Sequence, residues 1–297
     1  MTRPNSRNTR QAKGKSTGQG PVAATPLPEL RPGQSVALLQ ELHILPREGK
    51  LNQDSRRKLK QVDHLFQFIE KLLGELKPHA EELTLADHGA GKSYLGFIIH
   101  DLYFKARGTG HIYGIETRAE LVERSRQLAE RLGFERMHFL AMSAAESASA
   151  EGLPERIDVV TALHACDTAS DEAMARGVAL GARTILCAPC CQHQIQSQLE
   201  ITGPQRALLR HGILKERFAD LLADALRAQL LRVLGYSTRV VEFVEPEATA
   251  RNIMIRAERG PRPGMADAVQ EYLDLRDAWG AVPPLESLAG PQLAGLL

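Results

Sequence analysis

Two carboxylates and two glycines are spaced in this chain as they are in sites that hold a nucleotide-like cofactor. Asp87 ends an apolar run, and Gly89 and Gly91 follow it before a helical pattern begins at Lys92. Gly89 suits a tight turn, and Gly91 lets the backbone approach a ligand that a Cβ would block. A second apolar run ends in Glu116, whose carboxylate can accept hydrogen bonds from ribose hydroxyls. These residues predict a ribose-bearing cofactor, with Asp87 orienting the glycine loop or meeting an ammonium group.

The loop differs from two common phosphate-binding motifs. Ser93 stands where a dinucleotide-binding loop usually has its third glycine, and Lys92 lacks the spacing of a Walker loop. An adenosyl cofactor is therefore favoured, and the alternative is a tight turn that binds nothing. Ser143 and Ala144 follow the third predicted strand and are expected near the adenine, with an ordinary loop as the alternative. Leu163 ends the fourth predicted strand and is expected to line the same site.

Thiol, imidazole and carboxylate side chains follow the fourth and fifth predicted strands. The carboxyl ends of neighbouring parallel strands meet at one edge of a sheet, so these groups are expected beside the cofactor. Cys187 lies inside the fifth strand and is predicted to be a core residue. The candidate catalytic residues beyond the strand ends are His164, Cys166, Asp167, Cys190, Cys191 and His193.

Strand and helix patterns alternate along the middle of the chain and position these groups. Such short βα repeats indicate a parallel sheet with helices on both faces. Apolar runs predict strands at 83–87, 111–116, 137–141, 157–163 and 183–188, and helical spacing predicts helices at 54–73, 92–105, 121–132, 169–180, 205–234 and 265–279.

Two last strands, at 237–244 and 252–258, are joined by only seven residues. That connection is too short for a helical crossover, so the two strands are expected to pair antiparallel. The predicted fold is an α/β doubly wound, seven-stranded, mostly parallel sheet that ends in an antiparallel hairpin. A helix with Asp54 as its N-cap precedes it. This layout resembles that of class I S-adenosylmethionine methyltransferases, a Rossmann-like fold.

Four hypotheses stay open for the cysteine and histidine cluster. In the first, the cluster shapes a pocket for methyl transfer, and a histidine or Asp167 takes the proton of the acceptor. In the second, a thiol attacks a pyrimidine ring carbon. In the third, the cluster binds a metal, but adjacent cysteines rarely fit one tetrahedral ion, so no metal is expected. In the fourth, the polar residues only satisfy the strand ends.

The chain divides into four predicted regions. They are a disordered basic leader at 1–35, a helical segment at 36–80, a methyltransferase domain at 81–260 and a helical extension at 261–297. The first 28 residues hold five Lys or Arg and no acid, so the remainder carries a net charge of −4, against +1 for all 297 residues. An acidic body argues against broad, non-specific binding of nucleic acid.

Cysteine usage and hydropathy predict the compartment. All four cysteines lie between Cys166 and Cys191, which is not the pattern of a disulfide framework. The first residues lack the apolar stretch of a secretory signal, and no apolar run approaches the length of a membrane span. We therefore expect a cytoplasmic, reduced protein with no membrane partner. The oligomeric state is left open.

Several of these segments together resemble one branch of the class I methyltransferases. That branch includes the methyltransferase-like 25 proteins and the C-terminal domain of the glutathione S-transferase C-terminal-domain-containing protein. The resemblance implies S-adenosylmethionine as the cofactor, held by Asp87, Gly89, Gly91 and Glu116. It also implies an active-site rim made of the His-Ala-Cys-Asp and Pro-Cys-Cys segments, and it supplies no acceptor. The segments that carry it are Asp87–Lys92, Gly114–Arg118, Ala162–Ala169, Pro189–His193 and Thr249–Arg256.

The predicted function is methyl transfer from S-adenosylmethionine to a macromolecular acceptor, with RNA favoured. The alternatives are a protein or small-molecule methyltransferase, and a non-catalytic module that binds cofactor or metal. The fourth strand lacks the Asn/Asp-Pro-Pro-aromatic motif of many amino-group methyltransferases. RNA is favoured by the basic leader and by two basic stretches, namely Arg56–Lys60 and the group Arg206, Arg210, His211, Lys215 and Arg217.

Overall fold

The structure is a computed structural model that describes most of the chain after the basic leader. Residues 1–28, which are most of that leader, lie outside the described part, as do His164, Cys191 and the start of the last resembling segment, at 249–251. The described ranges are 29–46, 51–79, 81–149, 151–163, 165–190, 192–200, 203–243, 252–260 and 262–297.

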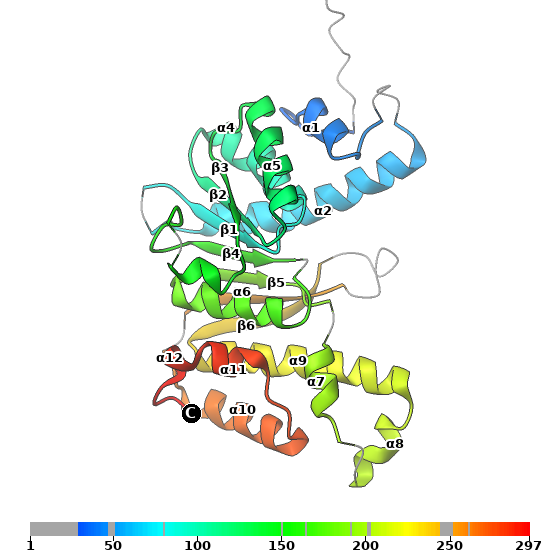
Figure 1. Cartoon of the computed structure of the whole chain (residues 1–297), viewed down its shortest axis with the longest axis vertical. Helices are drawn as coiled ribbons and strands as arrows, with labels where there is room; N and C mark the ends of the chain where they lie inside the picture. Colours follow the sequence, from blue (N-terminus) through cyan, green and yellow to red (C-terminus); the bar gives the residue numbers. More distant parts are fainter. Residues whose placement is uncertain are drawn as a thin grey trace, which may run out of the picture.

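One seven-stranded sheet runs through the molecule in the order β3-β2-β1-β4-β5-β7-β6 (Figure 1). The first five strands are parallel to one another, and β7 is antiparallel to both β5 and β6. This confirms the predicted class I methyltransferase fold. The strands are β1 Thr84–His88, β2 His111–Glu116, β3 Met137–Ala141, β4 Val159–Ala162, β5 Thr184–Cys187, β6 Tyr236–Glu242 and β7 Ile253–Arg259.

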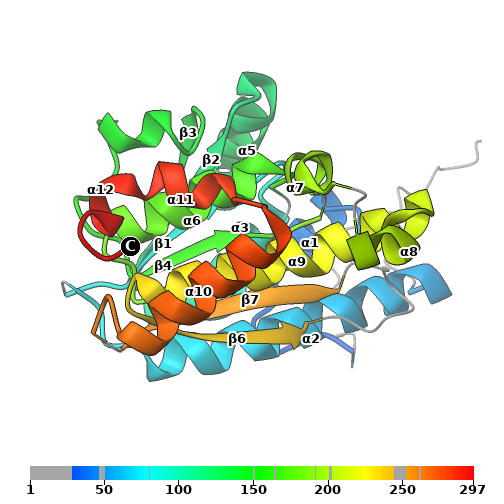
Figure 2. The same cartoon turned by 90° about the horizontal axis from the view of Figure 1, so that it is seen from below.

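Helices cover both faces of the sheet and bury two apolar cores (Figures 1 and 2). The residues of one core come partly from α1 Val36–Glu41, α2 Gln53–Glu75, α3 Tyr94–Ile99 and α5 Ala119–Leu132. The other core takes residues from α6 Thr168–Ala179, α7 His193–Gln198, α8 Arg206–Leu209, α9 Gly212–Val233, α10 Ala266–Trp279, α11 Pro284–Leu288 and α12 Gly290–Leu293.

The helix α2 forms because a short polar residue caps it and one face is apolar. The side chain of Asn52 accepts a hydrogen bond from the Ser55 backbone N–H at 2.8 Å, so the predicted N-cap, Asp54, is wrong by two residues. Leu59, Phe66, Ile69, Leu72 and Leu73 recur at helical spacing and are buried. The first turns of α2 lie on the side of the sheet where the parallel strands end (Figure 1).

The helix predicted at 92–105 starts later and contains a wider turn. Ser93 has a positive φ of 54°, so the helix starts at Tyr94. A π-helical turn at His100–Phe104 joins α3 to α4 Lys105–Arg107, and Gly108 ends the segment. A π-turn inserts one residue into the helical register, which the 3.6-residue spacing alone does not reveal.

Two other predictions need correction. The helix predicted at 205–234 is broken at Arg210–His211, where His211 has an extended backbone, and it therefore forms α8 and α9. The helical extension at 261–297 was predicted with the bounds of one helix, at 265–279, and it also contains α11 and α12. Among the described helices, none has both the length and the apolar composition needed to cross a bilayer.

Candidate cofactor site and acceptor edge

The two acids lie at neighbouring strand ends, as the sequence predicts. Asp87 pairs in register with Gly114, two residues before Glu116, so both carboxyl groups stand at the carboxyl edge of the sheet. Asp87 is 4% exposed and Glu116 is 6% exposed. Neither carboxyl group is freely solvated, and each accepts a hydrogen bond from another group of the protein.

The glycine loop needs both of its glycines for different reasons. Gly89 has a φ of +66°, and a Cβ there would lie 3.3 Å from the Cα of Ala165 in the segment after β4. Gly91 has a φ of +58°, and a Cβ there would meet only the Arg118 guanidinium, at 3.9 Å. Gly89 therefore permits packing against the segment after β4, whereas the backbone at Gly91 presents an open face to a ligand.

Glu116 is an ionised acceptor that ties the glycine loop to β2. Its carboxylate accepts hydrogen bonds from the Gly91 backbone N–H at 2.8 Å and from the Arg118 Nε at 2.9 Å. These bonds, with the Arg118 guanidinium first, lower the pKa of Glu116 to about 2. The Arg118 side chain is 59% exposed, so a ribose can displace it from the carboxylate at little cost in burial.

Asp87 has the opposite electrostatic environment. Its Oδ1 accepts a hydrogen bond from the Thr161 hydroxyl of β4 at 2.6 Å. Burial raises the pKa of Asp87 to about 7, and the Thr161 hydrogen bond only partly offsets that effect. A buried carboxyl at this strand end is suited to meet a cation, because an ammonium group would stabilise its ionised form.

We expect cofactor affinity to depend on pH through Asp87. The folded pKa of about 7 lies above the ordinary value of 3.8, so the carboxyl is protonated below pH 7. If it must ionise to hold the ammonium group of the cofactor, affinity falls by about tenfold per pH unit below 7 and is flat above it. Calorimetry with S-adenosylhomocysteine at pH 6, 7 and 8 measures this, and the Asp87→Asn variant should lose the dependence. A pH-independent affinity of the unaltered protein would contradict the assignment.

Ser143 and Ala144 follow β3 as predicted, but Ser143 has a structural task of its own. Its backbone N–H donates to the Glu146 carboxylate at 2.7 Å, and its hydroxyl accepts from the Glu146 N–H at 3.1 Å. This reciprocal pair caps the short 3₁₀ helix Glu146–Ser149. Ala144 is buried. Their contact with an adenine stays a prediction.

The structure brings together part of the predicted catalytic cluster. The Sγ atoms of Cys166, after β4, and Cys190, after β5, are 2.6 Å apart. Asp167 accepts a hydrogen bond from the Gln194 N–H at 3.4 Å, and His193 is the first residue of α7. His164 and Cys191 lie outside the described residues. Within the described residues, no three His, Cys, Asp or Glu side chains are placed to hold a metal ion.

Cys187 differs from the two rim thiols. It is fully buried in β5, and burial raises its pKa to about 12. A thiol with that pKa stays protonated at neutral pH, which agrees with its predicted place in the core. Cys166, in contrast, is exposed, so solutes reach it.

We expect Cys166 and Cys190 to form a disulfide under mild oxidation, because their sulfur atoms are already in contact. The two thiols would lose two protons and two electrons to the oxidant diamide as the S–S bond forms. Mass spectrometry of the digested protein should find the linked peptides, and Cys166→Ser should abolish the link. Unchanged turnover in Cys166→Ser and Cys190→Ser would exclude either thiol as the nucleophile.

A buried arginine that the sequence prediction missed supports this rim. Arg227 of α9 is 1% exposed and forms a salt bridge with Asp171 of α6, whose side chain is fully buried. Its guanidinium also donates to the Gln192 side chain and, at 3.3 Å, to the backbone carbonyl of Asp167. Asp167 has a positive φ of 52°, a conformation that a non-glycine residue keeps only when its surroundings hold it. Arg227 is therefore a positioning residue for both rim segments.

One sequence signal could have identified Arg227. Arg227 follows Leu226 in α9, and Ala223 and Leu230, which lie one helical turn before and after Arg227, are also buried. A charged residue inside an apolar stripe indicates a buried ion pair with a partner from another element.

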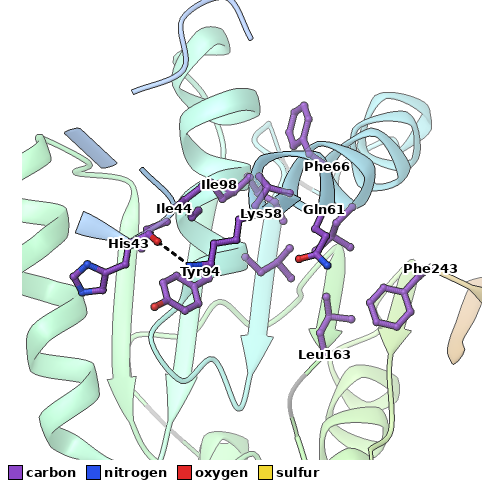
Figure 3. Close-up of a pocket in the computed structure, with 14 residues that line it drawn as sticks. His43, Ile44, Lys58, Gln61, Phe66, Tyr94, Ile98, Leu163 and Phe243 are labelled. Carbon is purple, nitrogen blue, oxygen red and sulfur yellow. Dashed lines mark hydrogen bonds between the residues drawn. The ribbon is translucent and has the colours of Figure 1, made fainter. Parts of the chain in front are cut away.

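A cavity at the same edge was also missed. It has a volume of about 500 Å³ and lies between α2, α3 and the segment Leu42–Ile44 after α1, with Leu163 just after β4 and Phe243 just after β6 on its border (Figure 3). Leu163, predicted to line the cofactor site, thus lines this cavity, and its cofactor contact stays a prediction. The cavity borders the rim where an acceptor would meet the cofactor.

The chain matches a known family over the part that forms this site. A family described as "Methyltransferase domain" matches residues 57–198. These residues include the glycine loop, both acids and both rim segments. The match confirms the predicted enzyme class, an S-adenosylmethionine-dependent methyltransferase, and S-adenosylmethionine as its cofactor.

Individual relatives are distant. The human glutathione S-transferase C-terminal domain-containing protein is 23% identical in an alignment over 237 residues. The alignment covers 71% of this chain and 35% of that protein. The mouse protein of the same name is 24% identical over 236 residues, with the same coverage. The chain therefore spans about a third of the length of these relatives. The magnesium protoporphyrin IX methyltransferase of Synechocystis PCC 6803, solved with bound SAH, is 15% identical, with a TM-score of 0.44, and the similarity covers 75% of this chain and 93% of that one.

Proposed function

Because residues 57–198 match a methyltransferase domain family, we propose that this chain transfers a methyl group from S-adenosylmethionine to an RNA acceptor. The observation that carries the choice of RNA is a group of exposed cations beside the carboxyl edge of the sheet. The cofactor site, which is the donor site of the reaction, and the carboxyl edge of the sheet, which we call the acceptor edge, support the proposal separately.

The donor site fits the cofactor on three observations. The outer face of Gly91 is open, Glu116 is an ionised acceptor beside it, and Asp87 is a buried acid that lacks a cation partner within the described residues. Glu116 would hold the ribose and Asp87 the ammonium group. When bound, the cofactor supplies an electrophilic methyl group. The chain has then to align the acceptor and take its proton, for which Asp167 and His193 are the described candidates.

The acceptor edge carries positive charge where it is exposed. The helix α8 and the start of α9 lie on the side where the parallel strands end (Figures 1 and 2). Such local cations attract phosphates even though the body of the chain is acidic overall. The basic residues of this stretch are Arg206, Arg210, His211 and Arg217, which are exposed, and Lys215, which is half-buried.

Labelling with the purified protein tests this function. The chain is incubated with methyl-labelled S-adenosylmethionine and with RNA, protein and metabolite fractions from a strain that lacks it. We expect label in the RNA fraction, removed by ribonuclease and absent with the Glu116→Ala variant. Label in the protein or metabolite fraction, or in none of the three, would overturn the choice of RNA.

A further inference from the structure

Two cavities of different character adjoin each other at the acceptor edge. The apolar cavity and a second, cationic cavity of about 260 Å³ share Leu42, His43 and Tyr94 in their walls. We propose that together they bind one nucleotide of the acceptor, with its base in the apolar cavity and its phosphate in the cationic one. This inference rests on the proposed RNA acceptor and assigns the residues that would recognise it.

The apolar cavity has the walls that a planar ring needs. Two aromatic side chains, Tyr94 and Phe243, lie around it (Figure 3), whereas the Phe66 ring is buried and is covered by the Arg31 guanidinium. Stacking on aromatic side chains is how proteins usually hold unpaired bases, because every base has a π-face. Tyr94 is 40% exposed, so its ring is accessible from solvent. Its place at the start of α3, just after the glycine loop, sets the cavity beside the donor site.

A polar group inside the apolar cavity favours a base over an acyl chain. The carboxamide of Gln61 is directed toward Leu163 (Figure 3), and within the described part of the chain it makes no hydrogen bond. A carboxamide offers a donor and an acceptor side by side, which match the edge of a nucleobase. An acyl chain in the cavity would leave that group desolvated and unsatisfied, which is unfavourable.

The second cavity has the charge that a phosphate needs. Lys92, Arg124 and Arg131 all line it. Arg131 is paired with Glu41 at 3.2 Å, whereas Lys92 and Arg124 form no ion pair with any described residue and are exposed. Two unpaired cations can neutralise one phosphate group. Because Lys92 follows Gly91 directly, a phosphate held there lies next to the loop of the donor site.

Leu163 connects the proposed nucleotide to the reaction. It lines the apolar cavity and begins the segment after β4 that holds the rim residues Cys166 and Asp167. A base in the cavity would therefore hold its nucleotide beside the groups predicted to take the proton. The two cavities would let a chain whose body is net acidic bind RNA, since only one nucleotide has to be held tightly.

Fluorescence anisotropy with a labelled single-stranded RNA decamer separates the two halves of the site. In the full-length chain, Lys92→Ala combined with Arg124→Ala should weaken binding by about tenfold at low salt and reduce the slope of log affinity against log salt by about 1. Tyr94→Ala and Gln61→Ala should each weaken binding by about five- to tenfold without changing that slope. Matched controls are Lys71→Ala, Arg262→Ala and Gln270→Ala, all exposed and outside both cavities.

The outcomes distinguish this inference from the proposed function. If all cavity variants bind and methylate RNA as the controls do, the nucleotide site is wrong while the RNA function stands. If the unaltered chain methylates no RNA, the function itself fails. Binding of phosphatidic acid vesicles in place of RNA, lost in the same variants, would replace the nucleotide with a lipid and overturn the inference. Thermal unfolding of each variant, compared with the unaltered protein, excludes loss of folding as the cause.

Discussion

Replacing Glu116 with alanine is expected to weaken the binding of S-adenosylhomocysteine by about a hundredfold or more. The substitution removes the predicted ribose acceptor and also the hydrogen bond from the Gly91 N–H at 2.8 Å, so the glycine loop loses its anchor to β2. Hydrogen bonds to a charged group contribute about 1.5–3 kcal/mol each, and two of them account for that loss. Isothermal titration calorimetry on both proteins measures it.

Two further variants show whether this loss is specific to Glu116. Glu116→Gln keeps one oxygen acceptor and the shape of the side chain, so we expect an intermediate effect. Glu123→Ala removes an exposed acid of α5 that pairs with Arg126 and should leave affinity unchanged.

Because the pKa of Glu116 is about 2, its carboxylate is ionised in the folded protein and loses its charge only as pH falls through that value. Its contribution should therefore be constant from pH 5 to 8. If Glu116→Ala binds S-adenosylhomocysteine with unchanged affinity, the assignment of Glu116 as the ribose acceptor is wrong.

The parts of the fold that were predicted best are those that local chemistry determines. The bounds of β2 and β3 agree with the prediction at both ends, because apolar runs and flanking turn residues mark them. The C-cap of α5 is Gly133, as expected, with a φ of 67°. Short βα units place successive parallel strands side by side, which holds for β1 to β3 and for β4 and β5, whereas β4 pairs with β1 and β7 lies between β5 and β6.

The parts that were missed depend on side chains far apart in the chain. Nothing local to Tyr94, Gln61 and Phe243 indicates that they line one cavity, because helix packing brings them together. The break at His211 was missed because the apolar pattern of Leu208, Leu209, Ile213 and Leu214 continues across it. The strand-end acids were predictable because the topology alone places the tips of β1 and β2 side by side.

Stability of the rim depends most on the buried pair of Arg227 and Asp171. We expect Arg227→Met to lower the free energy of unfolding by about 3–5 kcal/mol, because it leaves the Asp171 carboxylate buried without its cation. In a domain of this size the unfolding midpoint should fall by roughly 10 °C. Arg232→Met on the same helix removes only exposed pairs, with Glu271 and Asp267, and should cost less than about 1 kcal/mol.

A second substitution separates the charge from the packing around Arg227. In Arg227→Met combined with Asp171→Asn, the fully buried Asp171 carboxylate is removed together with its cation, and the more exposed Asp224 loses only its longer ion pair with Arg227, at 3.8 Å. The asparagine can still accept a hydrogen bond from the Leu285 N–H, which Asp171 accepts at 3.2 Å. Most of the lost stability should therefore return. Turnover should stay low while S-adenosylhomocysteine still binds, because the carbonyl of Asp167 has lost its donor at 3.3 Å and the rim is no longer held. If turnover returns together with stability, Arg227 supports only the fold, and the rim keeps its conformation without it.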